Sequence, residues 1–165
     1  MIKEKQRQQR KNYIKALYQY ASALLEKGDA RQALDVIKKC LARDEKSECF
    51  SLVYKYFALG KVCFALNRYE PARDALLFSI KCNKQNKPVD FVYELLARTY
   101  LGMDNTARAL QIIAEVPEKR RRPYYCQTHA DILCAVQDYK GALAVLERSQ
   151  KRDRLRLRVR LRNNR

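Results

Sequence analysis

The residues of this 165-residue chain that most often carry chemistry are one histidine, six cysteines and a few serines. A structural zinc site needs several ligands at set spacings, typically with a C-x-x-C pair. None of the cysteines is spaced in that way: they are Cys40, Cys49, Cys63, Cys82, Cys126 and Cys134. Most lie within apolar stretches, which predicts small core residues and free thiols. We therefore expect no metal site.

Nucleophilic catalysis needs a serine or cysteine beside a base, and His129 is the only imidazole in the sequence. His129 lies within an apolar-periodic segment, where we expect a neutral imidazole that is either in the core or half-buried. The sequence contains no Gly-rich phosphate loop and no nucleophile elbow, and Ser22 and Ser51 have no evident base. We predict no catalytic residue, no cofactor and no small-molecule substrate, which excludes an enzyme.

The positive charge of the chain is concentrated at its two ends. The 35 Lys and Arg against 18 Asp and Glu give a net charge of +17, of which residues 1–15 carry +5 and residues 150–165 carry +7. A further basic run, KRRR, occupies residues 119–122. No apolar stretch suits a secretory signal or a membrane span. We expect an intracellular protein, in the nucleus or cytoplasm, without membrane contact.

The elements that must position any binding residues are helices, because helix formers dominate and only four Gly and four Pro interrupt them. Short breaks split apolar-periodic segments into pairs, at 28–29, 67–69, 103–106 and 137–139. Longer connectors separate the pairs, at 43–48, 83–90 and 116–123. The sequence therefore predicts an all-α fold of eight helices in four hairpins.

A small residue recurs at the same place after every short break. These residues are Ala33, Ala72, Ala109 and Ala142. One helical turn later, on the same face, stand Ile37, Leu76, Ile113 and Leu146. Small side chains allow two paired helices to approach closely while larger apolar residues fill the space around the crossing. We therefore predict that the four alanines are repeat-packing residues.

This pattern resembles the tetratricopeptide repeat, a helix–turn–helix unit of about 34 residues. The clearest copy, YKYFALGKVCFALNRYEPARDALLFSIKC at 54–82, has an aromatic at Tyr56, the Leu-Gly pair at Leu59 and Gly60, and the packing alanine at Ala72. The resemblance implies an alpha-alpha superhelix of about four hairpins. We place it at residues 12–152, between a basic extension at 1–11 and an Arg-rich tail at 153–165.

The resemblance to this family implies a non-enzymatic scaffold or adaptor that binds protein partners on the face formed by the first helix of each pair. One subtype of this family binds the acidic carboxyl-terminal tails of heat-shock chaperones through Lys, Asn and Arg side chains. The corresponding positions here carry no such residues; they are Tyr18, Ser22, Ala58, Phe91 and Leu95. Tyrosine is common at interfaces, and several tyrosines lie outside the expected core. Our partner-binding candidates are Tyr18, Tyr54, Tyr124 and Tyr125.

A narrower resemblance involves residues 99–133, TYLGMDNTARALQIIAEVPEKRRRPYYCQTHADIL. This stretch is similar to the amino-terminal region of anaphase-promoting complex subunit 7, a family of tetratricopeptide scaffolds in a nuclear ubiquitin ligase of the cell cycle. The resemblance implies a homodimer formed through amino-terminal helices. A second copy of the chain is therefore one candidate partner.

The carboxyl-terminal segment, KRDRLRLRVRLRNNR, alternates leucine or valine with arginine. As a strand it would place the two kinds of residue on opposite faces, whereas a helix would spread the arginines around its axis. We consider three interpretations: a solvated end, a strand that pairs with a partner, and a segment that grips phosphates. The third gives an alternative function, salt-dependent binding of RNA or DNA. Its candidate residues are Arg154, Arg156, Arg158, Arg160 and Arg162.

Overall fold

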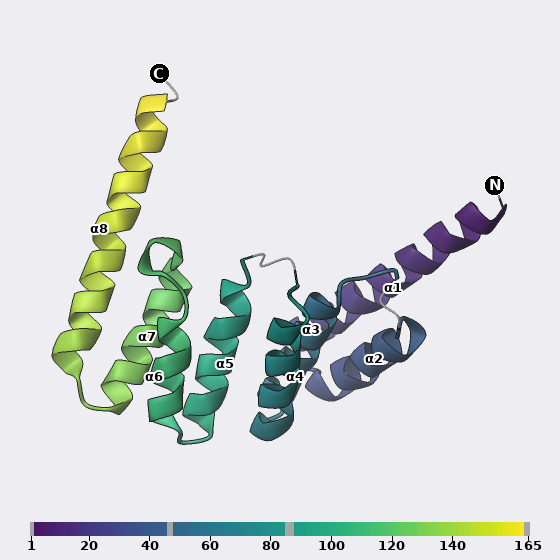
Figure 1. Ribbon diagram of the computed structural model, residues 1–165, viewed down its shortest axis with the longest axis horizontal. Coiled ribbons are helices and arrows are strands. Elements are labelled where there is room, and N and C mark those ends of the chain that lie inside the picture. The colour runs from purple at the N-terminus through teal and green to yellow at the C-terminus, as the bar shows by residue number, and fades with distance from the viewer. Residues whose placement is uncertain (1, 46–47, 85–87, 164–165) are drawn as a thin grey trace.

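The structure is a computed structural model that describes residues 2–45, 48–84 and 88–163. In these residues the chain forms eight α-helices and no strand, and a short 3-10 helix at Glu118–Arg120 precedes α7. The α-helices are α1 (Ile2–Glu26), α2 (Ala30–Arg43), α3 (Leu52–Ala65), α4 (Tyr69–Lys81), α5 (Asp90–Gly102), α6 (Thr106–Ala114), α7 (Pro123–Ala135) and α8 (Tyr139–Asn163). Four hairpins stack in chain order (Figure 1). The predicted all-α fold is confirmed.

All four hairpins turn in the same way. A residue with positive φ lies two positions after the end of each first helix, and these residues are Gly28 (87°), Asn67 (56°), Asp104 (57°) and Gln137 (63°). The N–H of the following residue donates to a carbonyl five residues earlier, at 2.9 Å in each hairpin. This arrangement satisfies the last carbonyls of the first helix and reverses the chain within two residues. The turns therefore fix where each second helix starts.

The residue after each positive-φ position begins the second helix. The side chains of Asp29, Asn105 and Asp138 each accept a backbone N–H three residues further on, at 2.9–3.1 Å. Arg68 holds the corresponding place in the second hairpin without such a bond. In all four hairpins the carbonyl of this residue accepts the N–H of the recurring alanine, at 3.0–3.1 Å. The alanine therefore always lies in the first turn of the second helix.

The recurring alanines are all buried in the stack. Ala33, Ala72 and Ala109 are wholly inaccessible to solvent, and Ala142 is 5% exposed. On the facing helix of the second hairpin, a Cβ added to Gly60 would lie 2.7 Å from the side chain of Leu76. Leu59, the neighbour of Gly60, is partly buried against the same core. A side chain at position 60 would therefore displace Leu76 from its place in this contact.

The buried core continues through the whole stack. One apolar cluster runs from Ile14 to Ala72, and a second runs from Val53 to Ile132. Phe64 packs against both clusters and joins them. Each first helix contacts the next first helix, and each second helix packs against the first helix of the following pair. The first helices α1, α3, α5 and α7 therefore form one side of the stack.

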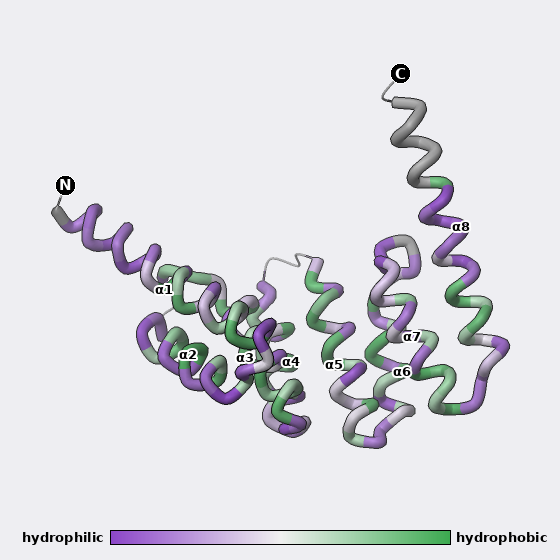
Figure 2. The backbone as a smooth tube through the Cα atoms, turned by 180° about the vertical axis from the view of Figure 1, so that it is seen from behind, coloured by the Kyte–Doolittle hydropathy of each residue, from purple (hydrophilic) through white to green (hydrophobic). Residues whose placement is uncertain are grey.

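The two terminal helices, α1 and α8, are longer than the others and extend beyond the stack (Figures 1 and 2). The boundaries placed at residues 11–12 and 152–153 fall inside these helices, so neither basic segment is set apart by a helix end. The strand interpretation of the tail is wrong, since α8 continues to Asn163. Leucine and arginine favour helices, and no proline or glycine after Gly141 stops this one.

Two of the three alanines of α6 test the close contact between paired helices. We expect Ala109→Val to lower the free energy of unfolding by about 1–3 kcal/mol, because an added methyl has no space there. Ala107→Val is the matched control, since Ala107 is exposed in the same helix and its substitution carries the same β-branching cost. Urea unfolding measures both. Equal effects of the two substitutions would contradict close packing at Ala109.

Candidate functional site

Five aromatic side chains form a continuous row across the first three hairpins, which we call the aromatic ladder. The ladder consists of Tyr18, Phe50, Tyr54, Phe57 and Phe91. Its ring centroids are separated by 4.8 Å from Tyr18 to Phe50, 6.1 Å from Phe50 to Tyr54 and 5.9 Å from Tyr54 to Phe91. Phe57 meets Phe91 edge to face at 4.6 Å. The ladder thus joins α1, the α2–α3 connector, α3 and α5 on one surface.

The connector that carries Phe50 is anchored by a buried ion pair. The Nζ of Lys55, in α3, lies 3.0 Å from the Oδ2 of Asp44 and donates to the Asp44 carbonyl at 2.7 Å. The Asp44 carboxylate also accepts the backbone N–H groups of Cys49 at 3.1 Å and Phe50 at 3.0 Å. The last of these bonds fixes the backbone from which the Phe50 ring enters the ladder.

Asp44 is ionised at neutral pH although it is fully buried. Burial acts to raise the pKa of its carboxyl group, but the hydrogen bonds from Lys55 and from the N–H groups of Cys49 and Phe50 outweigh burial, so the pKa lies below its ordinary value. A folded-state pKa below that of the unfolded chain stabilises the fold at neutral pH, and this stabilisation is lost as the pH falls.

The ladder combines buried and accessible rings. Tyr18 is half-buried, and burial, followed by the nearby Tyr54 and Cys40, raises the pKa of its hydroxyl. Tyr54 is 45% exposed, although its ring stacks on that of Phe91 with an angle of 5° between the planes. Stacking holds the Tyr54 ring in one orientation and leaves much of its surface available to a partner. Tyr54 is therefore the accessible centre of the ladder.

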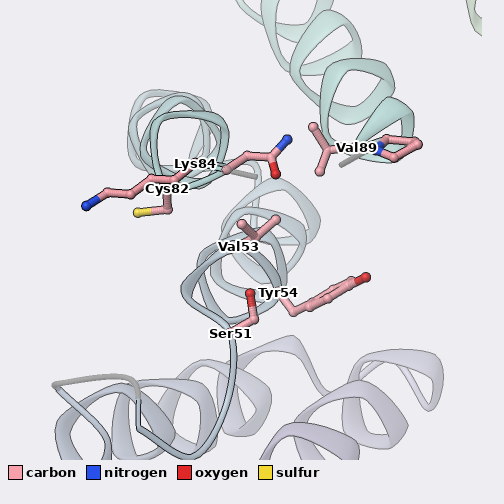
Figure 3. A pocket seen from close by; sticks show the side chains of 8 residues that line it. Ser51, Val53, Tyr54, Cys82, Lys84 and Val89 are labelled. Atoms are coloured by element: carbon pink, nitrogen blue, oxygen red, sulfur yellow. The ribbon is translucent and has the colours of Figure 1, made fainter. Parts of the chain in front are cut away.

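A cavity of about 450 Å³ adjoins Tyr54 at the edge of the stack (Figure 3). The start of α3 forms one wall, through Ser51, Val53 and Tyr54. The end of α4 and the α4–α5 connector form the other, through Cys82, Asn83, Lys84, Pro88 and Val89. The lining mixes apolar side chains with a lysine and an amide. The cavity thus extends the accessible surface of the ladder toward the connectors between hairpins.

The structure separates the other two tyrosine candidates. Tyr124 is exposed at the start of α7, outside the ladder, and burial raises the pKa of its hydroxyl. Tyr125 is wholly buried, and its hydroxyl donates to the carbonyl of Ile113 at 2.6 Å. The prediction that Tyr125 contacts a partner is therefore wrong. Consecutive helical residues point about 100° apart, and here Tyr125 faces the core while Tyr124 faces outward.

His129 has the environment expected from the sequence. It is half-buried, and its Nδ1 lies 3.4 Å from an Nη of Arg121. Burial lowers the pKa of the imidazole, and the charges of Arg121 and Arg148 lower it further, against the opposing effect of Glu118. The imidazole is therefore neutral at pH 7.

The six cysteines are free thiols. Cys40, Cys63 and Cys126 are buried, as predicted for core residues, whereas Cys134 is exposed. In the parts of the chain that the structure describes, no three or more side chains converge as metal ligands. Over the same residues, no helix is sufficiently long and apolar to cross a membrane.

The basic tail belongs to α8. Arg154 is exposed on this helix. The remaining candidates have side chains outside the described residues; they are Arg156, Arg158, Arg160 and Arg162. Contact between these arginines and a nucleic acid stays a prediction.

The sequence did not identify several residues of this site. Phe50, Phe57 and Phe91 were not partner-binding candidates, although aromatic residues near the starts of α3 and α5 were a usable signal. The Asp44–Lys55 pair had no local signal, because its partners are 11 residues apart across a connector. The structure unites Tyr18 and Tyr54 in the ladder, as two of the predicted candidates.

Comparison with known proteins supports the repeat architecture. Residues 14–47 match the family model described as tetratricopeptide repeat. A crystal structure of MamA has a TM-score of 0.68 and 16% identity, with 88% of this chain and 81% of that chain covered. The fold is that of a tetratricopeptide repeat array. No curated protein sequence matches this chain.

Two further solved structures share this array. MamA 41-end from Desulfovibrio magneticus RS-1 has a TM-score of 0.67 and 20% identity, covering 86% of this chain and 76% of that chain. A tetratricopeptide repeat protein from Parabacteroides merdae ATCC 43184 has a TM-score of 0.67 and 17% identity, covering 84% and 51%. At these identities the likeness shows the fold alone. The comparisons do not show the narrower resemblance to the anaphase-promoting complex.

The buried ion pair of the repeat array can be tested by removing its cation. We expect Lys55→Met to lower the free energy of unfolding at pH 7 by about 3–5 kcal/mol, because the Asp44 carboxylate stays buried without its countercharge. The double variant Lys55→Met/Asp44→Asn should recover most of this loss. It should also lose less stability than the wild type below about pH 4, where the Asp44 contribution disappears. Urea unfolding across pH measures both effects, and equal stability of the two variants would contradict an ionic anchor.

Proposed function

We propose that this chain is a non-enzymatic scaffold that holds an extended segment of a protein partner against the aromatic ladder. The tetratricopeptide fold supports a protein-interaction scaffold. The observation that carries the proposal is the position of Tyr54, which is 45% exposed yet fixed by stacking on Phe91. A rigid, partly exposed aromatic ring loses little entropy on binding, which is typical of interface hot spots.

The spacing of the ladder suits an extended chain. Its neighbouring ring centroids lie 4.8–6.1 Å apart. Alternate residues of an extended segment, whose side chains point to the same face, are about 6.6 Å apart. Successive same-side residues can therefore each meet one ring. We infer that the partner segment carries apolar or aromatic side chains at alternate positions.

Charged side chains form a polar rim beside two aromatic rings of α3, Phe57 of the ladder and Phe64, which lies outside the ladder. The Nζ of Lys61 lies 5.9 Å from the centroid of Phe57. On α5, Glu94 and Arg98 form an ion pair at 3.7 Å, and the Arg98 guanidinium lies 5.0 Å from the Phe64 ring. Polar rims exclude water from an apolar centre and set the register of a partner. A partner segment with charged residues beside its apolar positions fits this rim.

The other functional hypotheses stay predictions. A role in the anaphase-promoting complex and homodimerisation both depend on a sequence resemblance that the comparisons do not show. Nucleic-acid binding depends on tail arginines whose side chains, beyond Arg154, lie outside the described residues. None of these three hypotheses is supported by a contact among the described residues.

Selection of short peptides from a random display library against the wild-type protein would test the ladder. We expect Tyr54→Ala to weaken the selected peptides by about tenfold or more, which is the effect of removing a hot-spot aromatic. Tyr139→Ala is the matched control, because Tyr139 is also an exposed tyrosine but lies on α8, away from the ladder. Fluorescence anisotropy measures both affinities. Equal losses in the two variants, or unchanged binding in both, would contradict the proposed site.

A further inference from the structure

Three arginines from two elements converge around the α6–α7 connector. Arg121 lies in the connector, and Arg148 and Arg152 lie on α8. Arg152 donates to the carbonyl of Glu118 and, at 3.1 Å, to the Sγ of Cys126. Arg148 lies 3.5 Å from the Glu118 carboxylate. We call these three arginines the arginine cluster.

Arg121 is held in a fixed orientation. Its Nε donates to the carbonyl of Val116 at 2.8 Å, and its guanidinium lies 5.7 Å from the centroid of the buried Tyr125 ring. An Nη lies 3.4 Å from the Nδ1 of His129, in α7. These contacts are with neutral groups, so they orient the guanidinium without cancelling its charge. The group is therefore prepared to bind an anion.

The charge balance of the cluster is positive. The described contacts place one carboxylate at the cluster, that of Glu118 beside Arg148, whereas Arg152 contacts the Glu118 backbone carbonyl. Burial lowers the pKa of His129 most, and the charges of Arg121 and Arg148 lower it further. The pKa of this imidazole therefore depends on the charge around the two guanidiniums. An anion that binds beside two guanidiniums offsets their charge and therefore raises the pKa of a neighbouring imidazole. A rise in the pKa of His129 therefore reports anion binding at the cluster.

We propose that the arginine cluster binds a phosphorylated side chain of the partner segment. Clusters of arginines recognise phosphoryl groups through paired N–H donors, and three guanidiniums match the several acceptor oxygens of a phosphate dianion. This inference rests on the proposed function, because the phosphate is carried by a protein partner. It adds a second contact, distinct from the aromatic ladder, and names a chemical class of partner.

The cluster and the ladder are linked through the start of α5. Arg120, next to Arg121, forms a 2.6 Å ion pair with Asp90, and Asp90 precedes the ladder residue Phe91. The ion pair therefore places the connector that carries the cluster beside the start of α5, where Phe91 ends the ladder. The carboxylates of Asp90 and Glu94 belong to this part of α5. Each is paired with an arginine, Asp90 with Arg120 and Glu94 with Arg98, so neither adds net negative charge there.

The test uses a hexapeptide of alanine and glycine with one phosphoserine, together with its unphosphorylated form, its glutamate form, inorganic phosphate and an oligouridylate. NMR signals of His129, the only histidine in the chain, locate binding at the cluster. We expect the phosphopeptide to raise the pKa of His129 and to bind about tenfold or more tightly than the unphosphorylated peptide. Inorganic phosphate should move the same signals at higher concentration.

Two substitutions and one control make the test specific. Arg148→Gln should weaken the phosphopeptide about tenfold, and because Arg148 is exposed the fold should persist. Arg121→Gln should weaken it at least as much and abolish the His129 shift. Arg31→Gln, an exposed arginine of α2, should leave binding unchanged.

Several results would overturn the proposal. The first is an affinity for the phosphoserine peptide equal to that for the glutamate peptide or the unphosphorylated peptide. The second is tighter binding of the oligouridylate than of the phosphopeptide, detected at His129. The third is phosphopeptide binding that Arg148→Gln leaves unchanged. A library-selected peptide that needs Tyr54 but ignores every arginine substitution would overturn the phosphate site alone. Loss of Tyr54 dependence with an intact phosphate response would instead overturn the ladder.

Discussion

The close contact between two paired helices, made at an alanine in the first turn of the second helix, is the constraint on which the structure depends. A positive-φ residue follows the end of the first helix, the next residue starts the second, and the alanine follows four positions later. The turn therefore places the alanine methyl group in the contact between the two paired helices. Since the same turn occurs four times, the hairpins have similar shapes and can stack.

Stacking of the hairpins creates the binding face, and the connectors add individual residues to it. The first helices adjoin one another, so residues far apart in the sequence, such as Tyr18, Tyr54 and Phe91, share one surface. The α2–α3 connector adds Phe50 to this surface only because Asp44 and Lys55 are buried together beneath it. The ion pair thus fixes the position of the α2–α3 connector relative to α3, just as the alanines fix the spacing between paired helices.

Much of the fold follows from local patterns in the sequence. Apolar residues at helical spacing, the alanine after each break and the prolines of the connectors are sufficient to predict the helix pairs, because each signal acts within a few residues. The burial of Tyr125 and the exposure of Tyr124 follow from the rotation of α7 against α6, which no local pattern specifies. The continuation of α8 through the alternating tail shows helix propensity prevailing over a strand-like period.

The site was less predictable because it depends on long-range contacts. Tyr18 and Tyr54 were identifiable as tyrosines outside the expected core, but their connection through Phe50 needs the ion pair between a connector and the interior of α3. Likewise, the basic run near Arg121 is plain in the sequence, whereas its convergence with Arg148 and Arg152 requires the packing of α8 beside α7. Both groups combine residues that only the stack brings together.

The accessibility of alanine methyl groups tests the central claim most directly. Paramagnetic relaxation enhancement by a soluble agent, measured on methyl-labelled alanines, separates buried from exposed methyls in solution. The structure predicts weak enhancement at Ala33, Ala72 and Ala109, which are inaccessible, and strong enhancement at the exposed Ala107 of the same helix as Ala109. Strong enhancement at the three buried positions, equal to that at Ala107, would show that the paired helices do not meet there and would contradict the account.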